Sequence, residues 1–131
     1  MSEAQKMLNN AGTNLSEYDA IVNTVQHYIN GAESGRGTDM KPAFHPDATI
    51  FGYIGADLIA GPIQQLFDWN DQNGPAKELQ SRITSIDLTG TVATVRLELD
   101  NWTGHRFTDL FTLLKVEGEW KIINKVFHLH P

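Results

Sequence analysis

An acidic residue stands among phenylalanines in the second half of the chain. The residues from Arg106 to Val116 alternate, so that Phe107, Asp109 and Phe111 share one face of a predicted strand. Burying a carboxylate among apolar side chains costs several kcal/mol unless the group is paired or protonated. Asp109 is therefore the first candidate for acid–base chemistry in a pocket. The alternative is a carboxylate that anchors a loop or backbone amides, and both readings stay open.

Two histidines near the C-terminus supply a second candidate. His128 and His130 lie two residues apart, so they share a face of the predicted strand from Trp120 to His130. Together with Asp109 they could chelate a metal ion. A His-Leu-His segment more often closes the end of a sheet, and we predict no metal and no cofactor. His128 is interpreted as the catalytic, hydrogen-bonding partner of Asp109.

The strand register decides whether this pair meets. A turn at residues 117–118 makes the last two strands antiparallel, and counting outward from it places Asp109 near Lys125 and Phe127, within about one residue. His128 then lies diagonally from Asp109, at a distance on the order of 7 Å. A slip of one residue would turn His128 to the opposite face of the sheet.

Other polar and aromatic side chains are candidates for contacts with a ligand. The hydroxyl groups of Tyr28 and Tyr53 could donate hydrogen bonds into a cavity, and Trp69 and Trp102 could line a site for a flat molecule. Asn124 is assigned to the same face of the last strand as the two histidines. Aromatic residues at strand ends and on helix faces commonly belong to the core, so that alternative also remains.

Helical periodicity precedes strand-like alternation along the chain. A capping pattern at Ser16 opens an apolar stripe at helical spacing from Ile21 to Ile29. Thr38 caps a short second helix, and Gly61-Pro62 opens a third. The remaining segments alternate as strands: Ala48–Tyr53, Leu58–Ala60, Leu79–Leu88, Val92–Asn101, Arg106–Val116 and Trp120–His130. Helices followed by an antiparallel meander predict an α+β fold with the helices on one face of the sheet.

Composition narrows the classes of function. The 131 residues include no cysteine and carry a formal net charge of −6. Disulfides, thiolate zinc sites and thiol nucleophiles are excluded, and the acidic balance argues against nucleic-acid binding. No apolar run approaches the roughly 20 residues of a membrane span, and the first residues lack a signal segment, so we predict a cytoplasmic protein with no membrane contact. We predict a flexible lead at residues 1–14 and a single domain at residues 15–131.

The second face of the strand from Arg106 also carries apolar groups. Leu110 and Leu114 alternate there with Thr108 and Thr112. A monomer would expose this surface to water, whereas a sheet-to-sheet homodimer would bury it around a two-fold axis. The sequence therefore predicts a homodimer formed through the sheet.

Several segments resemble the nuclear transport factor 2-like superfamily. The order of elements and the closing segment Gly118-Glu119-Trp120-Lys121-Ile122 are similar to that superfamily, as are Phe44-His45-Pro46-Asp47-Ala48 and Gly61-Pro62-Ile63. More narrowly, the chain resembles the putative lumazine-binding branch at Asp100-Asn101-Trp102-Thr103-Gly104, Phe107-Thr108-Asp109 and Lys125-Val126-Phe127-His128. The resemblance covers about residues 15–131.

This resemblance implies a cone-shaped fold in which three N-terminal helices pack on a curved antiparallel sheet around a pocket, commonly in a homodimer. Ketosteroid isomerase, scytalone dehydratase and polyketide cyclases are relatives, alongside many non-catalytic binders. The strand that carries the isomerase's base corresponds here to Ala48–Tyr53, which holds no carboxylate. Isomerase activity therefore does not carry over with the resemblance.

Two functions follow from these residues and the resemblance. In the first, the protein binds a small, partly aromatic organic molecule and catalyses cofactor-free acid–base chemistry of the isomerase, cyclase or dehydratase type. Asp109 and His128 would be its catalytic groups, with Tyr28 or Tyr53 as a hydrogen-bond donor. The alternative is a non-catalytic dimeric module that binds a ligand or a partner. The sequence leaves open whether the protein is an enzyme.

Overall fold

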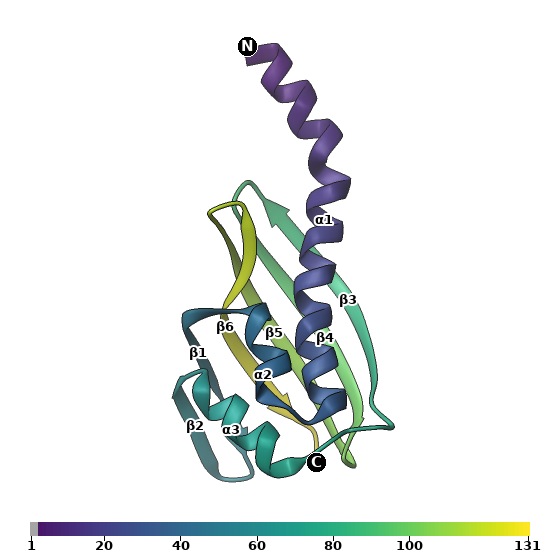
Figure 1. Ribbon diagram of the computed structural model, residues 1–131, viewed down its shortest axis with the longest axis vertical. Coiled ribbons are helices and arrows are strands. Elements are labelled where there is room, and N and C mark those ends of the chain that lie inside the picture. Colours follow the sequence, from purple (N-terminus) through teal and green to yellow (C-terminus); the bar gives the residue numbers. More distant parts are fainter. Residues whose placement is uncertain (1–2) are drawn as a thin grey trace.

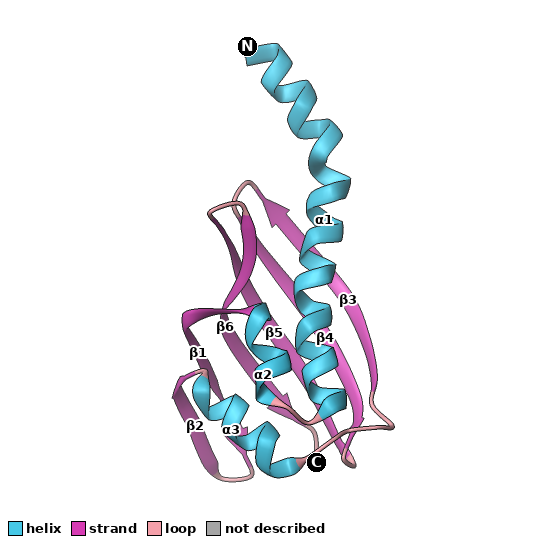
Figure 2. Cartoon of the chain, viewed as in Figure 1, coloured by secondary structure: helices cyan, strands magenta, loops and turns pink. Residues whose placement is uncertain are grey.

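The computed structural model describes residues 3–131, with side chains described from residue 15 onward. The elements are, in chain order, α1 (Glu3–Ser34), α2 (Gly37–Met40), the 3-10 turn η1 (Lys41–Ala43), β1 (Phe44–Ile54), β2 (Asp57–Pro62), α3 (Gln64–Asn73), β3 (Gln80–Thr89), β4 (Val92–Trp102), β5 (His105–Val116) and β6 (Glu119–Leu129). The three α-helices lie on one side of a curved six-stranded sheet that does not close into a barrel (Figure 1, Figure 2). The predicted α+β fold class is confirmed.

The strands are ordered β2-β1-β6-β5-β4-β3 across the sheet. The run β3 to β6 is the predicted antiparallel meander, and β1 and β2 form an antiparallel hairpin. One pair departs from the antiparallel expectation, because β1 and β6 are parallel. Short turns permit only antiparallel neighbours, whereas the long connection through α3 and the meander permits either direction.

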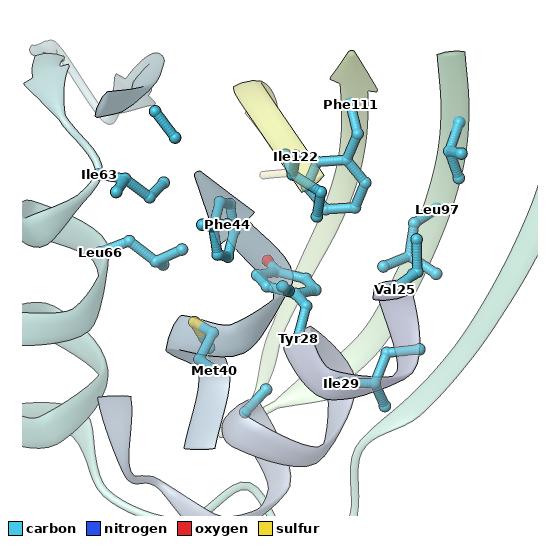
Figure 3. Close-up of a cluster of buried hydrophobic side chains, with 14 of the residues drawn as sticks. Val25, Tyr28, Ile29, Met40, Phe44, Ile63, Leu66, Leu97, Phe111 and Ile122 are labelled. Carbon is cyan, nitrogen blue, oxygen red and sulfur yellow. The ribbon is translucent and has the colours of Figure 1, made fainter. Parts of the chain in front are cut away.

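Helix α1 packs its apolar stripe against the concave face of the sheet. Ile21, Val25 and Tyr28 of this stripe are fully buried. Figure 3 shows the Tyr28 ring between the other helices and the sheet, close to Phe44 and Phe111. Its ring meets theirs edge to face, at centroid distances of 5.9 and 5.1 Å. This packing fixes where the Tyr28 hydroxyl can point.

Two helix starts differ from the prediction. Helix α1 begins at Glu3, not at Ser16, because the preceding segment contains good helix formers and continues the helix. Gly61 and Pro62 end strand β2 instead of opening α3, since β2 is an edge strand that tolerates proline. The division into a flexible lead, 1–14, and a domain, 15–131, stays a prediction. Within residues 3–131, no helix is long and apolar enough to cross a membrane.

A β-bulge interrupts the pairing of β5 with β6. Thr112 pairs with Asn124 and the next residue, Leu113, pairs with Ile122, so Ile123 is an extra residue in β6. An extra residue reverses the alternation of the strand beyond it. Asn124 is therefore not on the inward face to which the uninterrupted alternation assigned it: Ile122 is buried before the bulge, and Lys125 is buried after it.

Helices α1 and α2 approach each other closely at Gly31. A Cβ atom built on Gly31 would lie 2.5 Å from Cβ and 2.7 Å from Cα of Met40, which is fully buried. The carbonyl of Gly31 also accepts a hydrogen bond from the buried Asn70 side chain of α3, at 2.9 Å. Gly31 thus sets the spacing of all three helices above the sheet.

We expect Gly31→Ala to destabilise the protein by about 1–3 kcal/mol, although alanine in a helix interior is favoured over glycine by about 1 kcal/mol. The cause is overlap with the Met40 backbone, which is not free to move aside. Urea unfolding monitored by circular dichroism measures the change. Glu33→Ala, at an exposed position of the same helix, is the control and should change stability little. A stabilised Gly31→Ala variant would contradict the close approach.

Candidate functional site

An apolar cavity of about 150 Å³ lies between the β1–β2 hairpin, helix α3 and the ends of the central strands. A cavity of about this size can hold a molecule as large as benzene. Its walls are formed by Ile50, Ile54, Ile59, Gln65, Leu66, Trp69, Trp102, Phe107, Lys125 and Phe127. Among the described residues, Lys125 is the only charged side chain in these walls. The cavity is thus an apolar, aromatic-lined site with one amine.

From Lys125 in this wall, a buried hydrogen-bonded chain of three ionisable groups extends into the core. The Tyr28 hydroxyl donates to Oδ2 of Asp109 at 2.6 Å and accepts from Nζ of Lys125 at 2.7 Å. Nζ and Oδ2 are 3.9 Å apart. All three residues are buried, and we call them the Lys125–Tyr28–Asp109 chain.

Each member comes from a different element. Asp109 faces inward by the regular alternation of β5, and Tyr28 belongs to the buried stripe of α1. Lys125 faces inward because the bulge at Ile123 reverses the alternation of β6. Its backbone pairs with Phe111, two residues along β5 from Asp109. Three segments distant in sequence therefore converge on one point.

Burial drives all three groups toward their neutral forms. It raises the pKa of Asp109, while the charge of Lys125 and the Tyr28 hydroxyl oppose that rise. Burial lowers the pKa of Lys125, and the Asp109 carboxylate opposes the fall. The pKa of Tyr28 is raised well above its usual value by burial and then by the neighbouring Asp109. Burial and the charges of the neighbouring groups thus act in opposite directions on both Asp109 and Lys125.

Aromatic rings surround the Lys125 amine. Nζ lies 4.8 Å from the ring centroid of Tyr28, 5.6 Å from that of Trp102 and 5.4 Å from that of Phe127. The faces of such rings attract a cation and partly replace the water that it loses on burial. Trp102 and Phe127 also line the cavity, so the amine lies beside the space that a ligand would occupy.

Two buried polar atoms near the chain are left unpaired. Oδ1 of Asp109 and Nε1 of Trp102 have no hydrogen-bond partner among the described residues. Buried polar atoms of this kind are rare, because an unmade hydrogen bond costs about 1–3 kcal/mol. The indole N–H is a spare donor beside the cavity, and the carboxyl oxygen is a spare acceptor behind it.

The structure brings together some predicted site residues and separates others. Tyr28 contacts Asp109 as described, and Trp69 and Trp102 line the cavity. Asp109 itself does not reach the cavity wall. Tyr53 is 60% exposed, and Asn124 donates a hydrogen bond to Thr49 away from the cavity.

The predicted meeting of Asp109 with His128 is wrong. Asp109 pairs with Phe127, as the turn count predicted within one residue, but His128 is exposed on the opposite face. The bulge at Ile123 shifts the register by one residue, so Phe127 faces inward and His128 faces outward. The His128 ring packs against His130, whose Nε2 lies 2.8 Å from the Thr108 hydroxyl. Among the described residues, no group of three or more histidines and carboxylates could hold a metal ion.

Lys125 is the functional candidate that sequence reasoning missed. The turn count placed it near Asp109, but uninterrupted alternation assigned it to the outer face. The available signal was that Lys125 lies two residues before Phe127, so the two side chains share a face of the strand. That face is the buried one only because of the bulge at Ile123. Lys125 takes the position beside Asp109 that was predicted for His128.

Comparisons with known proteins agree with this architecture. Residues 16–128 match the model of the family described as "Putative lumazine-binding". The chain is 35% identical over 117 residues to Aldolase FrzH of Cladobotryum sp, covering 88% of this chain and 94% of that protein.

Two solved structures are also similar. One is an NTF2-like protein of unknown function from Methylobacillus flagellatus KT, with 55% identity, a TM-score of 0.88 and coverage of 90% of this chain and 95% of that one. The other is an NTF2-like protein of unknown function from Shewanella baltica OS155, with 45% identity, a TM-score of 0.86 and coverage of 91% and 98%.

We expect Lys125→Met to make stability strongly dependent on pH. The variant keeps the buried carboxyl of Asp109 but loses the cation that favours its ionised form, so the pKa of Asp109 rises further in the folded protein. Between about pH 4 and that raised pKa, the folded state holds a proton that the unfolded chain releases. The free energy of unfolding should therefore fall as pH rises, by up to about 1.4 kcal/mol per pH unit. Urea unfolding at a series of pH values measures this slope.

The double variant Asp109→Asn/Lys125→Met is the matched control. It removes both charges, so its stability should vary less with pH than that of Lys125→Met, and it should be the more stable of the two in neutral solution. Equal pH profiles for the single and double variants would show that Asp109 is not the titrating partner.

Proposed function

Because the chain belongs to the "Putative lumazine-binding" family of the nuclear transport factor 2-like superfamily, we propose that it binds a small, partly aromatic carbonyl compound in the cavity. We further propose that it transfers protons on that ligand without a cofactor. The observation that carries the proposal is a single amine at the wall of an apolar cavity, backed by a carboxyl group and a phenol. An apolar cavity with few, convergent polar groups is typical of a small-molecule site.

The lining supports a flat ligand of about one aromatic ring. Trp69 packs edge to face on Trp102 at 5.5 Å, and Phe107 lies 5.6 Å from Trp102, so the three rings form a continuous wall. The volume of about 150 Å³ accommodates a ligand of about the size of benzene.

The unpaired polar atoms support a carbonyl group on that ligand. The Trp102 N–H and the Lys125 amine are donors, and a carbonyl oxygen accepts hydrogen bonds but donates none. Donors beside a carbonyl stabilise the negative charge that develops on oxygen when a proton leaves the adjacent carbon. The relative named an aldolase, at 35% identity, supports this chemistry, since an aldol reaction begins with such a proton loss.

Proton transfer is assigned to the Lys125–Tyr28–Asp109 chain. Lys125 contacts the ligand, and Tyr28 passes the proton between Lys125 and Asp109. Asp109, behind the cavity wall, holds the proton between steps. Groups whose pKa values move toward neutrality in this way are suited to both giving and taking protons.

Acetophenone tests this proposal, because it combines one ring with a methyl group beside a carbonyl. In deuterium oxide the protein should accelerate exchange of the methyl hydrogens for deuterium, as followed by proton nuclear magnetic resonance. Asp109→Asn should slow the exchange by about 100-fold or more, as expected for loss of a general acid–base group. Asp87→Asn changes an exposed carboxylate and is the matched control.

Binding is read in the same samples from the indole N–H signals. Trp69 and Trp102 line the cavity and should shift on addition of acetophenone, whereas Trp120, which donates to Glu17, should not. Shifts without accelerated exchange would favour the non-catalytic binding module. No shift at either tryptophan would overturn the proposal.

We also propose that the protein forms a homodimer through the convex face of the sheet. Phe51, Val126 and Leu110 lie side by side across β1, β6 and β5 on that face, and their exposed fractions are 43%, 43% and 51%. A contiguous apolar row of this kind favours burial against a second copy. The predicted contribution of Leu114 is smaller, since that residue is already half-buried.

Sedimentation equilibrium tests the dimer. The wild-type protein should have about twice the chain mass of 14.6 kDa at micromolar concentration. Leu110→Asp should shift the mass to that of the monomer, because it places a charge within the apolar row. Leu15→Asp, at an exposed position of helix α1, should leave the dimer intact. A monomeric wild-type protein would refute the homodimer.

A further inference from the structure

Lys125 has the environment of a nucleophilic amine rather than that of a structural ion-pair partner. Its Nζ donates one hydrogen bond to Tyr28 but lies 3.9 Å from the nearest carboxylate oxygen, so no direct short bond to Asp109 occupies it. Its Nζ also lies over three ring faces, and two of these rings line the cavity. A neutral amine held in this way keeps a lone pair free on nitrogen.

We infer that Lys125 attacks the carbonyl carbon of a ligand in the cavity and forms an imine with it. The substrate class is a small aldehyde or ketone with one aromatic ring. This inference rests on the proposed function, which brings a carbonyl group next to the same amine, and adds a covalent intermediate to it.

The atoms and charges of this step balance within the buried chain. The Nζ lone pair forms a bond to the carbonyl carbon, and the π electrons of the carbonyl move to oxygen. One amine proton passes to that oxygen through Tyr28, which leaves a neutral carbinolamine. The nitrogen lone pair then forms C=N as the C–O bond breaks, and the proton held by Asp109 leaves with the hydroxyl group as water.

The products are one water molecule, a protonated imine on Lys125 and the carboxylate of Asp109. A neutral pair thus becomes an ion pair, and the new cation lies where Oδ2 of Asp109 and three ring faces can stabilise it. Burial supports the starting state, because it lowers the pKa of Lys125 and raises that of Asp109. No oxidant, reductant or metal is needed.

Reductive trapping with benzaldehyde tests the inference. The folded wild-type protein is treated in neutral solution with benzaldehyde and sodium cyanoborohydride, which reduces an imine to a stable benzylamine. Peptide mapping by mass spectrometry then gives the rate of labelling at each lysine. Lys125 should be labelled at least about tenfold faster than Lys41 and Lys77, which are exposed to solvent.

Two further measurements separate imine formation from general amine reactivity. Acetophenone should protect Lys125 and leave the labelling of Lys41 and Lys77 unchanged. Tyr28→Phe keeps the aromatic ring and removes the relaying hydroxyl, so the labelling of Lys125 should slow while that of the exposed lysines does not. Labelling of Lys125 that is neither fast nor protected would overturn the inference.

Failure of the inference is distinguishable from failure of the proposed function. If acetophenone shifts the Trp102 indole signal and exchanges its methyl hydrogens, yet benzaldehyde labels only Lys41 and Lys77, the cavity performs proton transfer without an imine. If acetophenone neither binds nor exchanges, the proposed function fails. Labelling confined to Lys125 and blocked by acetophenone supports both.

Discussion

The hydrogen bond between Tyr28 and Asp109 is the constraint on which the interior depends. A carboxyl group buried among phenylalanines destabilises a fold unless something satisfies it, and the Tyr28 hydroxyl does so at 2.6 Å. This bond joins helix α1 to the middle of strand β5, so it places the helix along the sheet as well as satisfying the acid. Lys125 then joins as a donor to Tyr28, with its Nζ 3.9 Å from Oδ2 of Asp109.

The Lys125–Tyr28–Asp109 chain stabilises the folded protein only when all of its members are present. Removing one partner of a buried charged pair typically costs about 3–5 kcal/mol, whereas replacing both by apolar groups can be neutral. A protein that needed only a stable core would gain little from this chain. Its presence beside an apolar cavity is therefore more readily explained by chemistry than by stability, which is the physical basis of the proposed function.

The fold and the site carry different amounts of functional information. The family and the two similar structures establish a helix-covered curved sheet, and this architecture by itself serves several chemistries. The functional information of this chain lies in the kind of group that it presents to the cavity. Asp109 lies behind the wall and Lys125 lies in it, so a ligand would meet an amine first and the acid only through Tyr28.

Local pattern in the sequence determined the α+β class, the antiparallel meander and the inward-facing position of Asp109. These features follow from side-chain period and turn residues, which act over a few neighbouring positions. The tertiary structure decided the parallel pairing of β1 with β6, the choice of Tyr28 as the partner of Asp109 and the inward turn of Lys125. The bulge at Ile123 arises where two strands must match one another in register, and a hydrogen bond between residues 28 and 109 exists only after the helix has packed. Such features depend on contacts between distant segments, which periodicity within one segment cannot encode.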